Sequence, residues 1–176
     1  MGRKVKYRSF LSIHEMMGVN KNGKTIKREV MTRSTKYITD DVVAGLLYDI
    51  DKQVYYLVSQ FRVGTSDEYR YLTEVVAGSV DVGETPLDSF KREAMEEVGF
   101  ECSIISEYGW LYTSPGGTKE RVYLFKAYGR RSDIGGGVYS EDEDIELLEY
   151  TKEEILKLDI RDMKTKYLIN TCIENN

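Results

Sequence analysis

The stretch from Gly78 to Phe100, GSVDVGETPLDSFKREAMEEVGF, most constrains the fold, because it gathers several carboxylates around one short helix with clear end signals. Thr85 is a good N-cap, Pro86 suits the first helical position, and Gly99 supplies a stop. Apolar residues recur at helical spacing and form one stripe: Leu87, Phe90, Ala94 and Val98. The rest of the chain therefore has to provide a core against which this stripe is buried.

A separate face of the same predicted helix is acidic and carries Glu93, Glu96 and Glu97. Two unit charges roughly 5 Å apart repel by about 3 kcal/mol at an effective dielectric of about 20. A divalent cation would convert this repulsion into binding. With His14 as the only histidine and no cysteine nearby, the ligands would all be oxygens, which favours Mg2+, with Mn2+ as a second option, over zinc. For three glutamates alone, the alternative is a solvated acidic face.

The spacing of the fixed residues is more specific than the charges. Gly78, five residues, Glu84, seven residues and then Arg92 to Phe100, REAMEEVGF, resembles the complete Nudix box of hydrolases that cleave nucleoside diphosphates linked to another group. Seven such matches arise by chance on the order of 10^-8 per starting position. The resemblance implies an α+β fold, an α/β/α sandwich with a mixed central sheet, in which Gly78 lies against the substrate. It also implies a structural ion pair between Glu84 and Arg92.

The same resemblance assigns roles at the acidic face. Glu93, Glu97 and the carbonyl of Ala77 would be metal ligands. Glu96 would support the metal site in catalysis.

Composition and length agree with one globular domain, either alone or with a small appendage. The chain has 176 residues, of which 41% are hydrophobic and 31% charged, so a disordered chain is excluded. The net charge of -5 argues against nucleic acid as the main partner. No segment approaches the roughly 20 apolar residues of a membrane helix, and the basic N-terminus lacks the apolar run of a signal peptide. Two distant cysteines indicate reduced thiols and a cytoplasmic protein.

Residues 1–40 are expected to form an N-terminal antiparallel strand unit, and residues 41–176 the hydrolase domain. Strands are predicted over 3–18 and 24–33, joined by a turn at the Asn22-Gly23 dipeptide. In the ADP-ribose pyrophosphatase branch of the family, a comparable unit builds a homodimer and lends residues to the partner's site. Arg28 resembles such a nucleotide contact. The alternative is an exposed strand arginine.

The remaining strands and helices form the predicted core. Arg62 ends a strand in a short family signature, where it would bind phosphate or would be an ordinary strand-end charge. Two C-terminal helices are predicted, the first opened by a capping box at Thr151 and the second capped by Asp162. Val76 stands where many family members carry proline. The predicted strands cover residues 41–48, 54–62, 71–77 and 122–127, with a loop at 63–70.

Two further loops carry expected site residues. Pro115 lies at the distance past the box where the ADP-ribose pyrophosphatase branch carries a marker proline, and Gly116-Gly117 is similar to the GDP-mannose hydrolase relatives. The resemblance implies substrate contacts at Pro115 and Gly116, although a plain hairpin connection would have the same residues. Residues 131–146 join a triple glycine to an acidic run that is otherwise read as solvated. By resemblance, Glu141 would be the catalytic base and Glu143 a metal ligand outside the box.

The sequence therefore predicts a Mg2+-dependent hydrolase of the pyrophosphate bond in a nucleoside diphosphate sugar, GDP-mannose or ADP-ribose, which releases a nucleoside monophosphate and a sugar phosphate. One alternative is a Nudix-fold sensor that binds nucleotide sugars without hydrolysis. Another is a house-cleaning enzyme that releases pyrophosphate from nucleoside triphosphates.

Overall fold

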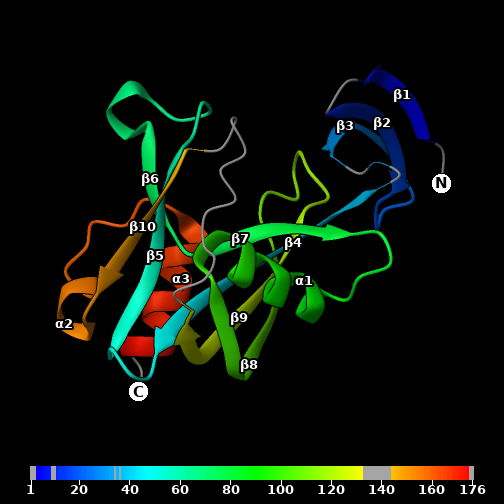
Figure 1. Cartoon of the computed structure of the whole chain (residues 1–176). Coiled ribbons are helices and arrows are strands. Elements are labelled where there is room, and N and C mark those ends of the chain that lie inside the picture. The colour runs from blue at the N-terminus through cyan, green and yellow to red at the C-terminus, as the bar shows by residue number, and fades with distance from the viewer. Residues whose placement is uncertain (1–2, 9–10, 34, 36, 133–143, 175–176) are drawn as a thin grey trace.

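A seven-stranded mixed sheet forms the body of the protein, as seen in a computed structural model that describes residues 3–8, 11–33, 35, 37–132 and 144–174 (Figure 1). The strand order is β10-β5-β4-β9-β8, with β6 paired to β5 and β7 paired to β4. β4 and β9 are parallel and the other pairs are antiparallel, which confirms the mixed sheet. The strands are β4 (Ile38–Asp49), β5 (Val54–Phe61), β6 (Tyr71–Glu74), β7 (Val76–Asp81), β8 (Phe100–Tyr112), β9 (Arg121–Arg131) and β10 (Ile145–Tyr150).

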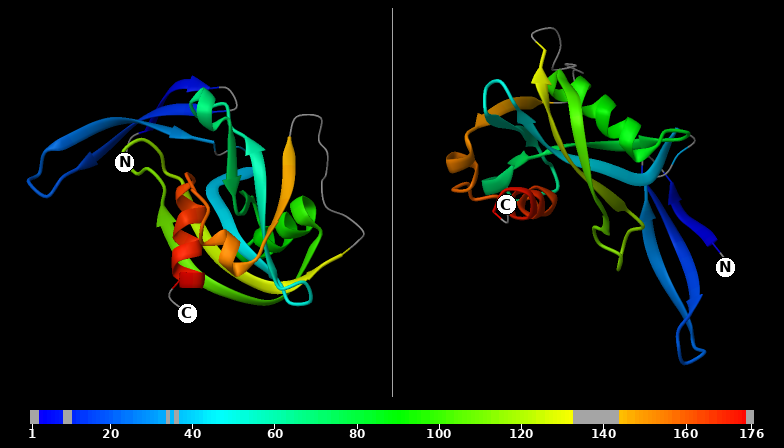
Figure 2. Two further views of the ribbon diagram at one scale, coloured as in Figure 1. Left: turned by 90° about the vertical axis from the view of Figure 1, so that its left-hand side faces the viewer. Right: turned by 90° about the horizontal axis from the view of Figure 1, so that it is seen from below.

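Helices cover both faces of this sheet and bury a separate core on each. On one face, Phe90, Ala94 and Val98 of the Nudix-box helix pack with residues such as Val43 and Leu47 of β4. On the other face, the C-terminal helices pack against alternate β4 residues, Ala44 and Leu46. Side chains of successive strand residues point to opposite faces, so one apolar strand supplies both cores. Figure 2 shows α1 and α3 on the two sides of the sheet, as expected for an α/β/α sandwich.

The Nudix-box helix begins and ends where the sequence predicts, but its pitch changes on the way. In α1 (Pro86–Glu93), Thr85 caps the start by accepting a hydrogen bond from the Asp88 amide at 3.2 Å. The helix then widens into a π-helical turn, η2 (Ala94–Val98), and ends at Gly99 with a left-handed φ of 69°. Phe90, Ala94 and Val98 are buried, which confirms this part of the predicted stripe, but the regular pitch of 3.6 residues per turn was wrong for the second half of the helix. Its residues are ordinary helix formers, so the sequence carries no signal for the wider turn.

The strand expected over residues 71–77 is two strands, because the chain changes partner at Val75. β6 pairs with β5, whereas β7 pairs with the first half of β4, from Val42 to Gly45. The second half of β4, from Leu47 to Asp49, pairs with β5. One long strand thus holds two different neighbours along the same edge. β5 and β7 pair with successive parts of β4 and diverge from each other, and residues of both strands line the site (Figure 1).

The N-terminal strands form a separate three-stranded antiparallel sheet, β1 (Arg3–Arg8), β2 (Ser12–Val19) and β3 (Thr25–Thr32), which projects from the body (Figure 1, Figure 2). The single strand expected over 3–18 was wrong, since Arg8 and Ser12 pair across a reversal that no Gly, Pro or Asn signals. The unit contacts the body where the Met31 amide donates to the Gly117 carbonyl at 2.8 Å.

Two C-terminal helices close the second core. α2 (Lys152–Ile155) carries the predicted capping box at Thr151, and Asp162 caps α3 (Met163–Ile169), which continues as η3 (Asn170–Glu174). Both cysteines are free thiols. In the described part of the chain, no helix is both long and apolar enough to span a bilayer. The apolar residues of α3 and η3 face this core, with exposures of 0–2% at Leu168, Ile169, Cys172 and Ile173.

Candidate active site

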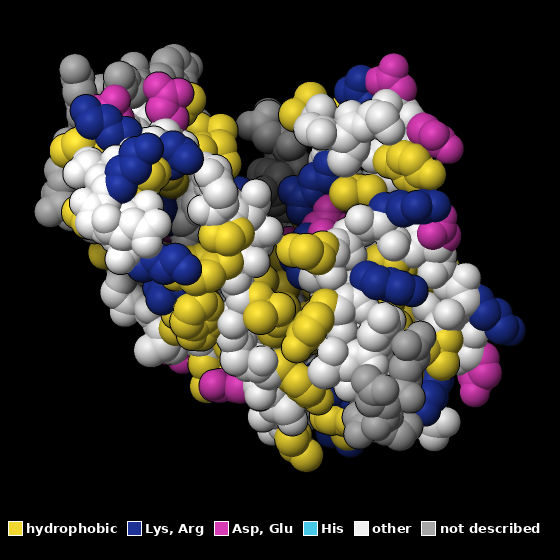
Figure 3. Space-filling view, turned by 180° about the vertical axis from the view of Figure 1, so that it is seen from behind, with side chains coloured by type: hydrophobic (Ala, Val, Ile, Leu, Met, Phe, Trp, Pro, Cys, Tyr) yellow, Lys and Arg dark blue, Asp and Glu magenta, His cyan; other side chains and the backbone are white. Residues whose placement is uncertain are grey.

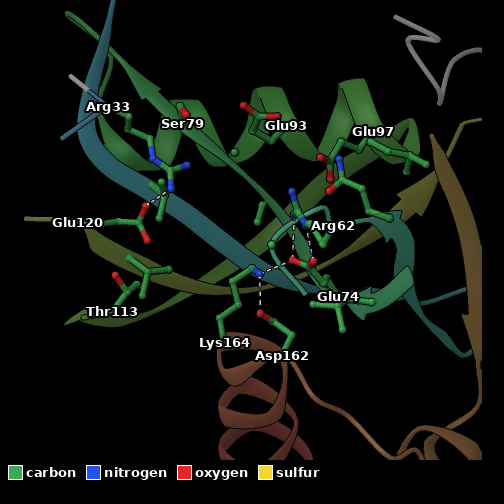
Figure 4. A pocket seen from close by; sticks show the side chains of 18 of the residues that line it. Arg33, Arg62, Glu74, Ser79, Glu93, Glu97, Thr113, Glu120, Asp162 and Lys164 are labelled. Atoms are coloured by element: carbon green, nitrogen blue, oxygen red, sulfur yellow. Dashed lines mark hydrogen bonds and ion pairs between the residues drawn. The ribbon is translucent and has the colours of Figure 1, made fainter. Parts of the chain in front are cut away.

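A cavity of about 1130 Å³ opens between the diverging strands β5 and β7, beneath the Nudix-box helix. Its lining comes from segments far apart in the sequence, from Arg33 to Lys164. Figure 4 shows these side chains, with the helix above and the start of α3 below. Seen from behind, the N-terminal unit and the body stand on two sides of a hollow with charged side chains in its wall (Figure 3).

The acidic wall of the cavity is built by the end of α1 and the wide turn η2. Glu93, Glu96 and Glu97 all line the cavity, as do Ala77 and Gly78 of β7 opposite them. A methyl group added at Gly78 would lie 1.9 Å from Cδ and 2.0 Å from Oε1 of Glu93. Only glycine therefore lets the Glu93 carboxylate lie directly against the β7 backbone, beside the Ala77 peptide.

Arg92 binds the acids of this wall together. Its Nη1 donates to Glu93 at 2.7 Å and to Glu96 at 3.0 Å, and its Nη2 donates to Glu84 and to the Ser79 carbonyl at 3.3 and 3.1 Å. Burial alone would disfavour the charged guanidinium, but the hydrogen bonds to these carboxylates raise the pKa of Arg92 above its ordinary value. The Glu84 contact is the expected ion pair between loop and helix.

The opposite wall carries a second charge cluster, centred on Glu74 at the end of β6. Arg62 donates to both oxygens of Glu74, at 2.6 and 3.0 Å, and Lys164 donates to the same carboxylate. The Glu74 side chain is only 2% exposed. Burial would raise the pKa of Glu74, but Arg62 and Lys164 outweigh it and hold this pKa below its ordinary value. The two cations thus keep a buried carboxylate ionised.

At the end of the cavity nearest the N-terminal sheet, Arg33 pairs with Glu120. Their side-chain atoms are 2.7 Å apart, and both residues line the cavity. Arg33 follows β3, whereas Glu120 precedes β9, so this ion pair joins the two sheets at the cavity wall (Figure 4).

The residues expected at the site fall into four groups. Those that line the cavity are Arg62, Ala77, Gly78, Arg92, Glu93, Glu96 and Glu97. Arg28 and Pro115 instead line a second, smaller hollow of about 470 Å³ between the N-terminal sheet and the loop before β9. Gly116 lines neither the cavity nor this hollow. Glu141 and Glu143 lie outside the described residues.

Sequence reasoning assigned no site role to Glu74, Lys164 or Arg33. A charged residue inside an otherwise apolar strand was the available signal for Glu74, since a glutamate is almost never fully buried unless it is paired. Lys164 and Arg33 gave no such signal, because each is an ordinary charge beside a helix start or strand end. Only the tertiary arrangement brings them to the cavity.

The acidic wall fits a hard divalent cation. Glu93 and Glu97 offer carboxylate oxygens. Because Gly78 has no side chain, the Glu93 carboxylate can lie against the β7 backbone. Neither a histidine nor a cysteine lines this cavity among the residues that the structure places. Within those residues, no group of three or more His, Cys, Asp or Glu side chains already converges as a metal site. A ligand set built on Glu93 and Glu97 would therefore also draw on backbone carbonyls or on residues beyond the described ranges.

Comparison with known proteins agrees with this geometry. A profile of the NUDIX domain matches residues 39–168. The chain is 40% identical over 162 residues to a GDP-mannose pyrophosphatase of Citrobacter koseri and 38% identical over 162 residues to one of Escherichia coli, with 85% of this chain and 80% of each relative covered. A crystal structure of an ADP compounds hydrolase superposes with a TM-score of 0.73 at 18% identity, covering 99% of this chain and 93% of that one. At that identity the likeness shows the fold.

Proposed function

The chain belongs to the NUDIX domain family, and from this membership we propose that it hydrolyses the pyrophosphate bond of a nucleoside diphosphate sugar. GDP-mannose is the first candidate substrate and ADP-ribose the second. The products would be a nucleoside monophosphate and a sugar phosphate. Relatives named GDP-mannose pyrophosphatase, with up to 40% identity over most of both chains, support the first candidate.

The observation that carries this proposal is the division of one cavity into a wall with excess carboxylates and a wall that presents two cations. Glu93 and Glu97 form the acidic wall, while Arg62 and Lys164 stand on the opposite wall. A diphosphate is an anion that binds divalent cations. Its site therefore needs carboxylates that hold the cation and cationic side chains that bind the phosphate oxygens. The cavity offers both within reach of one ligand.

On the acidic wall, Glu93, Glu97 and the Ala77 carbonyl would hold Mg2+, or Mn2+, with Glu143 as a further ligand. When bound, the metal supplies charge neutralisation at the phosphate oxygens and lowers the pKa of water. Glu96 would support these ligands through Arg92, to which it is bound at 3.0 Å. Gly78 would let the substrate and the Glu93 carboxylate approach the same stretch of backbone.

Proton transfer would fall to Glu141. A carboxylate in reach of a water molecule can orient it and accept its proton during in-line attack on phosphorus. Arg62 would meanwhile hold the phosphate, since its contacts with Glu74 use only part of its guanidinium donor set. The two charged walls would thus fix the substrate while the base acts on water.

The N-terminal unit, residues 1–40, would make a homodimer, with residues 41–176 as the hydrolase domain. Arg28 and Pro115 line a hollow away from the acidic cavity, an arrangement that suits contacts with a partner's substrate, and Gly116 adjoins Pro115. Exposed hydrophobic residues on β8, Trp110 to Tyr112 at 43–52% exposure, would add to such an interface. A cytoplasmic location would suit the free thiols of Cys102 and Cys172.

A substrate screen tests this proposal directly. The purified chain would be incubated with Mg2+ and with GDP-mannose, ADP-ribose, other nucleotide sugars, dinucleotide cofactors and nucleoside triphosphates, and both products would be identified by phosphorus NMR. Two monophosphates are expected from a nucleotide sugar. Release of pyrophosphate from triphosphates, or tight binding with no product over hours, would contradict the proposal.

A further inference from the structure

We infer that Glu74 is a positioning residue, which holds Arg62 and Lys164 side by side as a cationic wall for the phosphate oxygens of the substrate. The inference rests on the proposed function for the identity of that substrate. It adds a residue that has no contact with substrate of its own and acts through the two cations.

The geometry places Glu74 behind the cations. Its side chain is 2% exposed, that of Lys164 is 19% exposed and that of Arg62 is 39% exposed. Exposure therefore increases from the carboxylate toward the cavity. Oε1 of Glu74 accepts from Nε of Arg62, and Oε2 accepts from Nη2 of Arg62 and from Nζ of Lys164. One buried carboxylate thus fixes the direction of both cations (Figure 4).

The backbone around Glu74 is tied to the start of α3, where Lys164 originates. The Val75 amide donates to Oγ1 of Thr165 at 2.8 Å, and that hydroxyl donates to Asp162 at 2.6 Å. Asp162 also accepts from Lys164 at 2.8 Å. Thr165 is fully buried, so these bonds are shielded from water. Three elements, β5, β6 and α3, are therefore locked together at the wall.

A carboxylate is needed here for a physical reason. Two cations held close together repel and would turn apart if no anion stood between them. Both keep donors for a ligand, because their hydrogen bonds to Glu74 and Asp162 use only part of each donor set. Preorganised donors bind an anion without first being ordered, which is where the gain in affinity arises.

The test replaces Glu74 with glutamine. The side-chain volume is kept, but one carboxylate oxygen that accepts hydrogen bonds becomes an amide NH2 group that faces Arg62 or Lys164. We expect the KM for the nucleotide sugar and the Kd for methylenediphosphonate, measured by calorimetry, to rise by about tenfold or more. The kcat at saturating substrate and the Mg2+ activation constant should stay near those of the unmodified chain. An unchanged KM and Kd, or tighter binding, would overturn the inference.

A double-mutant cycle separates positioning from mere structural support. If Glu74 acts through the cations, Glu74→Gln should have a smaller effect on Kd in a Lys164→Met background than in the unmodified chain. Additive effects would contradict the inference. Asp159→Asn, which breaks the exposed pair with Arg161, is the matched control and should leave Kd unchanged.

Melting temperatures check that each variant is folded. If Glu74→Gln folds poorly, Glu74→Asp serves as a second variant. Because it retains the charge, it should retain more affinity for the diphosphonate than Glu74→Gln does. The diphosphonate measurement needs no turnover. Absence of hydrolysis by the unmodified chain would thus refute the proposed function alone, whereas an unaltered Kd in the variant would refute the positioning role alone.

Discussion

Two charge clusters stand on different walls of one cavity, and their compositions are inverted. In the first, a single cation, Arg92, is shared among Glu84, Glu93 and Glu96. In the second, a single buried carboxylate, Glu74, is shared between Arg62 and Lys164. The first cluster leaves negative charge in excess, so it can accept a further cation. The second cluster has no net charge once Asp162 is included, so its role is to fix the directions in which Arg62 and Lys164 point.

The inversion teaches that charge excess and charge balance serve different tasks in one site. An excess of carboxylates favours binding of a divalent ion, because the ion relieves their repulsion. A buried cluster with equal numbers of cations and carboxylates has little net charge. It resists rearrangement, because a group that left its partner would be an unpaired charge shielded from water.

The largest effect is expected from Glu97→Gln on the acidic wall. Loss of one metal-binding carboxylate should remove roughly 4 kcal/mol of transition-state stabilisation, which is about a thousandfold in kcat. The measurement is steady-state hydrolysis at saturating Mg2+, with circular dichroism to show an unchanged fold. Glu149→Gln, in an exposed pair with Lys52, is the control. Full activity of Glu97→Gln under these conditions would remove Glu97 from the metal site.

Gly78→Ala should give the next largest effect, through the same wall. The added methyl group would collide with the Glu93 carboxylate, which must then leave the β7 backbone. We expect Mg2+ activation to weaken by about 10- to 100-fold, as it does when groups that orient metal ligands are lost. Gly18→Ala on β2, where an added methyl group meets nothing within 4 Å, should keep the activation constant. Equal behaviour of the two variants would show that Glu93 needs no such approach.

Removal of Arg92 should affect stability. Arg92→Ala leaves three carboxylates without their shared cation, and we expect the free energy of unfolding to fall by about 2 kcal/mol. Because the repulsion among these acids would then be relieved by a metal, Mg2+ should restore more stability to this variant than to the unmodified chain. Urea unfolding with and without Mg2+ measures both effects. The control is Arg130→Ala, which removes an exposed pair with Asp51 and should change neither the stability nor its response to Mg2+. If Mg2+ restored no stability to Arg92→Ala, a cation site beside Arg92 would be contradicted.

The two clusters also differ in how far the sequence could reveal them. The first lies within thirteen consecutive residues, from Glu84 to Glu96, and the spacing of its members carried the family resemblance. The second joins β5, β6 and α3, and no local pattern places Lys164 beside Glu74. Local signals predicted the caps at Thr85, Thr151 and Asp162, because a cap depends on its neighbours in the chain.

Features that depend on which strands pair in the folded chain could not be predicted from the sequence. The change of partner at Val75 depends on which part of β4 each strand meets, and the residues on its two sides are equally strand-like. The reversal between Arg8 and Ser12 has no Gly, Pro or Asn to mark it. The helical wall of the site was therefore predictable, whereas on the wall where distant segments meet Arg62 was predicted but Glu74 and Lys164 were not.

The smallest expected effect is the pH dependence of stability, and it separates the clusters once more. The folded-state pKa of Glu74 is lowered, since Arg62 and Lys164 overcome the opposing effect of burial. Its contribution to stability is thus fully present above the ordinary value of 4.5 and is lost as the pH falls through the lower folded value. The difference in unfolding free energy between the unmodified chain and Glu74→Gln should therefore shrink as the pH is lowered from about 7 to about 3.

Glu84 should show the same sign of pH dependence, because hydrogen bonds from Ser89 and then Arg92 lower its pKa. Its side chain is 31% exposed, however, against 2% for Glu74. Salt screens exposed charges far more than buried ones. The acid-dependent difference for Glu84→Gln should therefore decline in about 1 M NaCl, while that for Glu74→Gln should persist. Equal salt sensitivity would mean that the wall around Glu74 is open to solvent, and that its cations are not held in fixed directions.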